Sequence, residues 1–367
     1  MVNVNKVLGP NVTFVQADLT ELVDESTIKI KRITEGTAGK EEELSFDFLT
    51  LCTGAIYAIN ETPQSIAKIY TKDARSSLFV KYREQIEEAE SVLVVGGGAT
   101  GLEMVGELLI RFGETKKIGV ANSTPHLLTG FPENASKAAE EYLESKGVKV
   151  HLNTKYDPKS SLAHEYAFVI NCVGQTFYTP YLDANFKDFK DKRGRVLVNE
   201  YFQVTNVNPC EAPASGAPDA RTLKNVFCYG DAALTRMDEV KVVPSISQTV
   251  SIVANNLKES LNESPNFTEM DYGVSVLASV YFGEDKGVSV ANSFAEVKDD
   301  ILGSKAWVQG AYFAFLTNQP DGGEKVGQVV QWVTNALQTI NAEGSACSDR
   351  PVKEKRKAHL DKIFGRS

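Results

Sequence analysis

The sequence predicts an α/β protein with two doubly wound domains and a small C-terminal α+β domain. A short apolar strand runs into a glycine-rich turn and a helix at residues 91–113. Strand and helix patterns keep alternating over residues 116–152, as a parallel sheet with crossover helices requires. An apolar strand ending in Cys-X-Gly occurs at residues 46–55 and again at 166–175, which indicates a second domain of the same kind.

The bulk composition narrows the function classes. The chain has 367 residues and a formal net charge of −9, which disfavours binding to the phosphate backbone of a nucleic acid. No apolar stretch reaches the roughly 18 residues of a membrane span, and the N-terminus lacks the pattern of a secretory signal. The five cysteines form no CxxC or other close pair, and the four histidines are scattered, so no metal site or redox disulfide is predicted. We therefore expect a cytoplasmic protein without nucleic-acid partners.

The glycine-rich turn follows the apolar residues 91–95. Gly96, Gly98 and Gly101 form GxGxxG, with an additional Gly97. In such a motif the first glycine makes a tight turn, the second lets the backbone approach a pyrophosphate, and the third lets the helix pack closely on the strand. The N-terminus of the following helix would stabilise the pyrophosphate charge. The pattern is typical of a Rossmann-like dinucleotide-binding domain.

The surrounding elements support a ligand at this turn. A second strand is predicted at residues 116–123, a helix at 133–146 and a third strand at 148–152. This βαβαβ order is the context in which the motif binds a nucleotide. The alternative is a tight structural turn that holds no ligand.

The end of the second strand leaves the choice of nucleotide open. An Asp or Glu there would bind the ribose 2′-hydroxyl of NAD, and a nearby Arg would accommodate the 2′-phosphate of NADP. The chain has Ala121, Asn122 and Ser123 at this place. Either NADH or NADPH is therefore compatible with the sequence.

The segments on either side of this unit also show regular patterns. Strands are predicted at residues 11–22 and 26–33, with a return strand at 44–52, and a helix at 80–90 leads into the glycine-rich unit. Downstream, an apolar strand ends in Gly-Asp within residues 223–233, and a helix is predicted at 245–261.

These features together resemble the FAD/NAD(P)-binding pyridine nucleotide-disulfide oxidoreductase superfamily, and within it the apoptosis-inducing-factor-like and ferroptosis-suppressor-like group. Four stretches carry the resemblance, at residues 49–55, 91–108, 194–204 and 225–233. Their order and spacing agree with that group over roughly residues 10–290. Members of the group begin with their own strand-GxGxxG-helix unit for FAD. We expect this chain to lack that N-terminal FAD unit, because its single GxGxxG corresponds to the second one of the group.

The resemblance implies a domain organisation. A partial FAD-binding domain is expected at residues 1–88, an NAD(P)-binding domain at 89–175, the second part of the FAD-binding domain at 176–262, a C-terminal domain at 263–348 and a basic tail at 349–367. The tail could dock on an anionic membrane surface, where a lipid-soluble quinone is available. The alternative is a solvated tail without a partner.

The resemblance also implies cofactor contacts. Asp231 would hydrogen-bond FAD at its ribityl or ribose region, and the helix after it would point its positive end at the flavin pyrimidine edge. A turn after the strand is the alternative role for Asp231. The implied cofactor-binding residues are Thr53, Gly54, Gly96, Gly97, Gly98, Gly101, Asn122, Gly174, Gly230, Asp231, Pro244 and Ser245.

Two catalytic residues are implied in the same way. Glu103 matches a glutamate of the group near the flavin–nicotinamide junction, and Lys241 lies within one residue of a lysine near the flavin. Glu103 could instead stabilise its helix through the helix dipole, and Lys241 could be a solvated loop residue.

The implied function is that of an FAD-dependent NAD(P)H oxidoreductase. A hydride would pass from NAD(P)H to the flavin and onward to a quinone or another small acceptor. Disulfide-reductase chemistry is disfavoured because no cysteine pair accompanies the flavin. The alternative is a flavin-less NAD(P)H-binding module or an inactive truncated chain.

Overall fold

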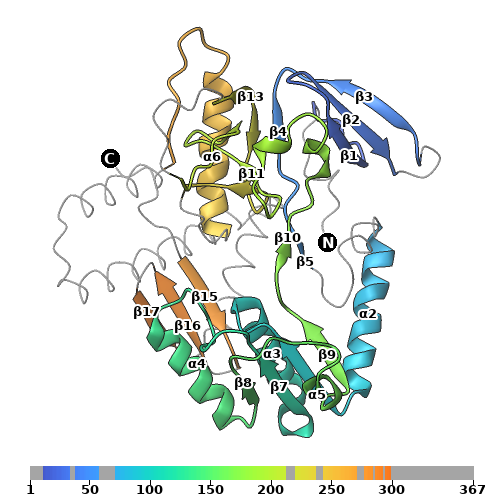
Figure 1. Ribbon diagram of the computed structural model, residues 1–367, viewed down its shortest axis with the longest axis vertical. Helices are drawn as coiled ribbons and strands as arrows, with labels where there is room; N and C mark the ends of the chain where they lie inside the picture. Colours follow the sequence, from blue (N-terminus) through green and yellow to red (C-terminus); the bar gives the residue numbers. More distant parts are fainter. Residues whose placement is uncertain are drawn as a thin grey trace, which may run out of the picture. The chain divides into compact units, whose positions relative to one another are not determined.

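The computed structural model describes residues 11–33, 38–57, 71–211, 220–236, 243–270, 277–283, 286–291 and 294–298. The chain divides into two compact units, and the larger unit comprises Thr13–Met270 and Ser275–Ile301. All of the helices and strands described below belong to this larger unit. Figure 1 shows them along the chain. They mix α-helices with parallel and antiparallel sheets, so the predicted α/β class is confirmed.

A four-stranded parallel sheet forms the centre of the glycine-rich region. Its strands are β6 (Ser91–Val95), β7 (Lys117–Ala121), β8 (Lys149–His151) and β9 (Phe168–Asn171). They lie in the order β8-β7-β6-β9, and every neighbouring pair is parallel. The first strand in sequence therefore lies inside the sheet, with its successors on one side and β9 on the other. This is the strand order of a nucleotide-binding half of a doubly wound fold.

Helices connect and cover these strands. Helix α3 (Ala99–Phe112) follows β6, α4 (Glu133–Ser145) follows β7, and the short α5 (Ser161–His164) precedes β9. Helix α2 (Lys72–Glu88) precedes β6 and starts well before the predicted residue 80. Its start is fixed by Thr71, whose side-chain hydroxyl accepts a hydrogen bond from the Ala74 N–H at 3.1 Å.

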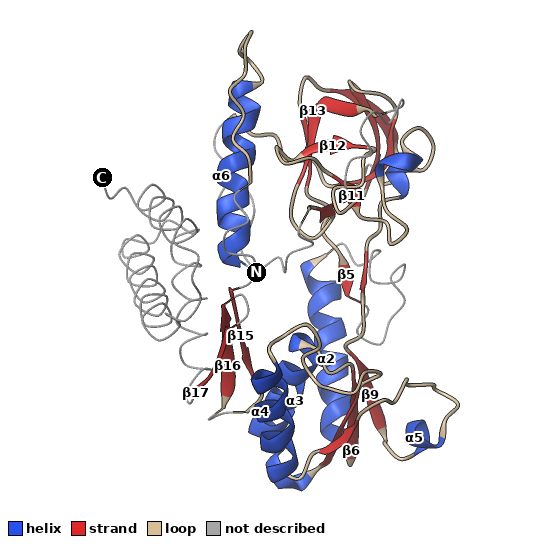
Figure 2. Cartoon of the chain, turned by 60° about the vertical axis from the view of Figure 1, so that its left-hand side comes forward, coloured by secondary structure: helices blue, strands red, loops and turns tan. Residues whose placement is uncertain are grey.

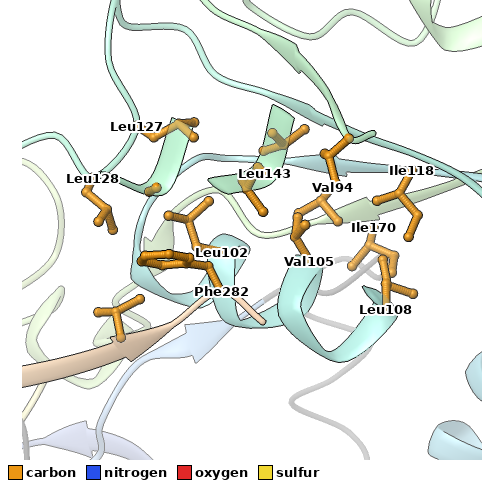
Figure 3. Close-up of a cluster of buried hydrophobic side chains, with 14 of the residues drawn as sticks. Val94, Leu102, Val105, Leu108, Ile118, Leu127, Leu128, Leu143, Ile170 and Phe282 are labelled. Atoms are coloured by element: carbon orange, nitrogen blue, oxygen red, sulfur yellow. The ribbon is translucent and has the colours of Figure 1, made fainter. Parts of the chain in front are cut away.

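The buried core of this region lies between the sheet and the helices α3 and α4 (Figure 3). Leu102, Val105 and Leu108 lie on one face of α3, as the 3.6-residue period predicts. They pack with strand residues such as Val94 and with Leu143 of α4. Burying an aliphatic side chain of this kind contributes about 1.5–3 kcal/mol to the stability of the fold. This cluster therefore holds the glycine-rich turn at the carboxyl end of β6.

A three-stranded antiparallel sheet packs on the same helices. Its strands are β15 (Leu277–Tyr281), β16 (Gly287–Ala291) and β17 (Phe294–Lys298), and it lies beside α3 and α4 (Figure 2). A Cβ on Gly106 of α3 would lie 3.1 Å from the Gly283 nitrogen, so the close approach depends on a glycine. Of the predicted C-terminal domain at 263–348, the described residues are 263–270, 277–283, 286–291 and 294–298, and the basic tail at 349–367 lies outside the described residues.

A second group of strands comes from segments that precede and follow the glycine-rich region in the sequence. The strand β13 (Thr222–Cys228) pairs in parallel with β4 (Leu49–Leu51) and antiparallel with β12 (Gln203–Thr205). The strand β11 (Val196–Leu197) pairs with β14 (Ala233–Leu234), and α6 (Val243–Glu259) follows. The predicted Cys-Gly and Gly-Asp strands thus become parallel neighbours.

The strands β1 (Ala17–Leu22), β2 (Thr27–Arg32) and β3 (Glu41–Ser45) form a separate antiparallel sheet. The prediction of one return strand over residues 44–52 is wrong, because β3 and β4 belong to different sheets. The Asn225 side chain donates to the Asp47 carbonyl at 2.9 Å in the bend between these strands. This long-range contact has no signal in the local sequence.

The repeated Cys-X-Gly pattern has a structural meaning. Strand β4 leads through Gly54 into β5 (Ile56–Tyr57), and β9 leads through Gly174 into β10 (Gln175–Thr176). Both glycines have positive φ, +69° and +81°, which other residues rarely adopt. Strands β5 and β10 then pair with each other. The two copies therefore end strands of two different sheets, as predicted, and their continuations meet.

Candidate dinucleotide-binding site

The glycine turn between β6 and α3 is fixed by close backbone contacts. Gly96 has φ +108°, and its N–H donates to the Ala121 carbonyl of β7 at 2.8 Å. A Cβ on Gly96 would lie 3.0 Å from the Cys172 carbonyl oxygen. A Cβ on Gly101 would lie 1.8 Å from the Gly96 carbonyl oxygen, which is a direct collision. The first and third glycines of the motif are therefore required by packing, as predicted.

Gly98 differs from these two glycines. It is the N-cap of α3, with φ −78° and ψ −176°, which any residue can adopt. Apart from its chain neighbours, no atom of the described residues lies within 4 Å of the position that a Cβ on Gly98 would take. The N-terminal N–H groups of α3 donate no hydrogen bond to a side-chain cap at this position. Such an open helix N-terminus suits an anion, and the turn fits the pyrophosphate of a dinucleotide.

Asn122 holds the turn from the end of β7. Its Oδ1 accepts a hydrogen bond from the Gly97 N–H at 3.1 Å, and its Nδ2 donates to the Thr124 hydroxyl at 2.6 Å and the His126 carbonyl at 2.7 Å. The residue is only 9% exposed. A Cβ on Gly97 would lie 2.5 Å from the Leu127 side chain, so Gly97 is packed against the same loop. The predicted nucleotide contact Asn122 is thus placed as a support of the turn, with its side chain directed inward.

Two predicted FAD contacts lie at a shared sheet edge. Leu51 of β4 pairs with Cys228 of β13, so Gly54 and Gly230 follow at the carboxyl ends of parallel neighbouring strands. Gly230 has φ +76°, and a Cβ on either glycine would meet no described atom within 4 Å outside its chain neighbours. Ligands of α/β sheets bind outside such strand ends. Asp231 follows Gly230 and is half-buried.

Thr53 is tied to the second part of the chain. Its hydroxyl shares a hydrogen bond of 2.9 Å with the hydroxyl of Tyr181, a residue of the 3₁₀ helix Pro180–Leu182. Tyr181 is 2% exposed, and this burial raises the pKa of its phenol. The hydroxyl therefore stays neutral at physiological pH and fixes the Thr53 side chain next to Gly54.

The remaining predicted site residues are placed in part. Glu103 lies in the second turn of α3 and is half-buried. Pro244 and Ser245 lie in the first turn of α6, where proline is common, but their side chains are outside the described residues. Lys241 also lies outside the described residues. The structure therefore places the predicted residues at two sites. One site contains the glycine turn and Asn122, and the other contains Thr53, Gly54, Gly230 and Asp231.

The sequence patterns did not predict that Cys172 lies beside the glycine turn. Its N–H donates to the Val95 carbonyl at 2.8 Å, and its Cβ would lie 3.6 Å from a Cβ on Gly101. Burial raises the pKa of the Cys172 thiol to about 11, so the thiol stays protonated at neutral pH. Within the described part of the chain the cysteines are free thiols, and no cluster of metal-ligating side chains is found.

Among the helices of the described residues, none is both long and apolar enough to cross a membrane.

Comparisons with known proteins show the family of the chain. Residues 2–245 match the family described as pyridine nucleotide-disulphide oxidoreductase. The chain is 29% identical over 274 residues to the oxidoreductase ptaL of Pestalotiopsis fici, covering 72% of this chain and 68% of that protein. It is 25% identical to apoptosis-inducing factor homolog A of Dictyostelium discoideum, covering 69% and 65%, and 25% identical to ferroptosis suppressor protein 1 of Xenopus tropicalis, covering 72% of each.

Solved structures show the same fold at low identity. NDH2 of Plasmodium falciparum superimposes with a TM-score of 0.54 at 14% identity, covering 86% of this chain and 83% of that one. The reduced CoADR-RHD of Bacillus anthracis gives a TM-score of 0.53 at 14% identity, and the matched part spans 75% of this chain and 47% of that one. This chain therefore belongs to the pyridine nucleotide-disulphide oxidoreductase family and is similar within it to apoptosis-inducing factors and ferroptosis suppressor proteins.

Proposed function

We propose that this chain is an NAD(P)H oxidoreductase that uses FAD to pass electrons to a quinone or another small acceptor. The observation that carries the proposal is the glycine turn, in which Gly96 and Gly101 are fixed by packing while Gly98 faces open space at the N-terminus of α3. A turn selected only for packing would not need the glycine at position 98. Family membership and the named relatives support the same function.

The chain's own residues would hold the nicotinamide nucleotide at this turn. The backbone N–H groups at the start of α3 would bind the pyrophosphate, and the helix dipole would add a favourable interaction with its charge. Asn122 would keep the turn in place through its bond to the Gly97 N–H. Orientation of the nucleotide by fixed backbone groups is the chain's contribution, since the redox chemistry belongs to the cofactors.

FAD would be held at the edge formed by β4 and β13. Gly54 and Gly230 leave the backbone open to close approach there, and Asp231 follows directly. When bound, FAD supplies the ring that accepts the hydride and returns electrons. The first turn of α6 would present its positive dipole end to an anionic group. The implied roles of Glu103 and Lys241 at the flavin remain part of this proposal.

The thiol chemistry supports the proposed class of acceptor. The sequence holds no closely spaced cysteine pair, and the Cys172 thiol has its pKa raised to about 11 by burial. A dithiol relay within the chain is therefore not supported, which favours a quinone or another small molecule as acceptor. Contact of the basic tail with a membrane that contains quinone is a proposal as well.

One observation favours the second candidate, an NAD(P)H-binding module without flavin. Among the described strands, β4 is paired on one side only, with β13. FAD sites of this fold class place a glycine-rich turn of their own at the pyrophosphate. The two candidates differ in flavin binding and share the nucleotide site.

The visible absorption spectrum of the purified full chain separates them. The proposed reductase should show flavin bands after addition of FAD, and these bands should bleach when NADH or NADPH is added without oxygen. Reoxidation by a soluble quinone would then identify the acceptor class. Absence of flavin bands together with measurable nucleotide binding would establish the second candidate, and absence of both would refute the site at the glycine turn.

A further inference from the structure

A cavity of about 270 Å³ lies between the helices α2 and α3 and the strand β9. Its wall is mainly apolar and contains four aromatic rings. The lining residues used below are Phe79, Tyr82, Met104, Phe112, Phe168 and Ile170. An apolar cavity of about 150 Å³ in a protein can bind benzene, so the volume found here admits an aromatic body of one or two rings.

Helix α2 is anchored to the rest of the region at its C-terminal end. The Lys116 Nζ donates to the Glu87 carbonyl at 2.8 Å and to the Ala89 carbonyl at 2.6 Å, and Ile86 packs against the buried core. Nearer the start of the helix, Phe79 lines the cavity and is still 56% exposed. A ligand in the cavity would therefore bury aromatic surface that the chain itself leaves in contact with water.

Two arginines also line this cavity, Arg83 of α2 and Arg111 of α3. Both face the same carboxylate oxygen, Glu87 Oε1. Arg111 forms an ion pair with it, whereas the Arg83 Nε lies 4.0 Å away, which is too far for a hydrogen bond. No other ion-pair partner of Arg83 is found among the described residues. The Arg83 guanidinium group therefore has donors available for an anion.

The other charges around the cavity do not cancel this cation. Glu107 lines the cavity, and its carboxylate accepts a hydrogen bond from the Tyr281 hydroxyl. The Lys116 Nζ lies 4.7 Å from the centre of the Phe112 ring and adds a further positive charge. Among the described side chains at the cavity, the cationic groups thus outnumber the carboxylates.

We infer that this cavity binds a small aromatic carboxylate. Its ring would lie against Phe79, Phe112 and Phe168, since aromatic rings pack favourably on one another. Its carboxylate would pair with Arg83, because the planar guanidinium fork matches the two oxygens of a carboxylate. The cavity lies toward the C-terminal end of α3, whereas the glycine turn lies at its start. The inference therefore goes beyond the proposed function and does not rest on it.

Two probes of equal ring size test the class of ligand. The full chain, without nucleotide, would be titrated calorimetrically with 2-naphthoate and with the neutral 2-naphthylmethanol. We expect 2-naphthoate to bind about fivefold more tightly, because only this probe can pair with Arg83. Arg83→Gln should remove this preference and leave the affinity for the alcohol unchanged. Lys81→Gln is the matched control, since it removes an exposed cation of α2 that does not line the cavity, and it should change neither affinity.

Phe79→Ala tests the location of the probes. It should weaken both of them about fivefold, whereas Val80→Ala, at the exposed neighbouring position outside the lining, should weaken neither. The inference is wrong if neither probe binds, if both bind the unmodified chain equally tightly, or if Phe79→Ala leaves both affinities unchanged. A dimer of the unmodified chain that Phe79→Ala dissociates would assign the cavity to a second copy of the chain instead.

These titrations contain no nucleotide, so they succeed or fail independently of the glycine turn. Loss of the proposed nucleotide site would leave the binding of 2-naphthoate unchanged.

Discussion

At the residue scale, the glycines of one turn serve different purposes, and this difference can be measured. Gly98→Ala adds a methyl group where the chain itself has room, at φ −78°, so the free energy of unfolding should stay within about 0.5 kcal/mol of the unmodified chain. The same methyl group would obstruct the pyrophosphate, so NADPH and NADH should both bind at least about tenfold more weakly. Isothermal titration and chemical denaturation of the same sample provide both quantities.

Gly101→Ala is the control for this pair of effects. Its Cβ would collide with the Gly96 carbonyl oxygen at 1.8 Å, so stability itself should fall by about 3 kcal/mol or more. Equal stability losses in the two variants would show that Gly98 is a packing residue, and unchanged nucleotide affinity in Gly98→Ala would remove the pyrophosphate from this turn.

Asn122 allows a second prediction at this scale. Asn122→Ala would leave the buried Gly97 N–H without its acceptor, which should lower the free energy of unfolding by about 1–3 kcal/mol. The turn would lose its support, so affinity for NADPH and NADH should fall by the same factor. Ser123→Ala, at the exposed neighbouring position, should leave stability unchanged. Full stability of Asn122→Ala would contradict the supporting role.

Cys172 gives a prediction for alkaline pH. Burial raises the pKa of its thiol from 9.0 to about 11, so between these pH values the unfolded chain loses a proton that the folded chain retains. Stability should therefore fall as the pH rises from 9 to 11, by about 1 kcal/mol at pH 10. Cys172→Ala should lack this contribution, which denaturation series at pH 8 and pH 10 would reveal as a smaller loss. An equal loss in both proteins would assign the alkaline effect to other groups.

At the element scale, predictability depended on where the stabilising contacts lie. Strand β6 has the predicted bounds, because its apolar run and the glycines that end it are local signals. The predicted strand at 44–52 is two strands, because its division depends on pairing with β13 and on Asn225, far away in the sequence. The same reason explains which parts of the site could be predicted from the sequence. The motif located the glycines, whereas the inward direction of Asn122 depends on the loop that folds over it.

The packing of β15 on α3 leads to a prediction for whole elements. Gly106→Val would force side-chain atoms against the backbone of residues 282–283, which a Cβ alone would already approach within 3.1 Å. We expect β15–β17 to loosen from α3, with faster proteolysis in residues 277–298 and a stability loss of about 1–3 kcal/mol. Ile110→Val, on an exposed position of α3, serves as control. Unchanged proteolysis in Gly106→Val would contradict this packing.

At the scale of the whole molecule, side-chain contacts hold together the segments that precede and follow the nucleotide-binding sheet in the sequence. The Asn225 Nδ2 donates to the Glu25 carbonyl at 2.7 Å and to the Asp47 carbonyl at 2.9 Å, and Arg221 forms an ion pair of 2.7 Å with the Glu25 carboxylate. Residues 91–171 are thus inserted between two stretches that contact each other. An inserted sheet with its own core should bind nucleotide independently of these contacts.

Asn225→Ala tests this independence, because it removes both hydrogen bonds without touching the glycine turn. The free energy of unfolding should fall by about 1–2 kcal/mol, while the affinity for NADPH stays unchanged. Retention of FAD at the proposed site should weaken together with stability, since Asp47 lies in the bend that leads into β4 and Gly54. A matched loss of NADPH affinity would mean that the two regions act as one cooperative site, and that the nucleotide site is completed only when the segments around it are in place.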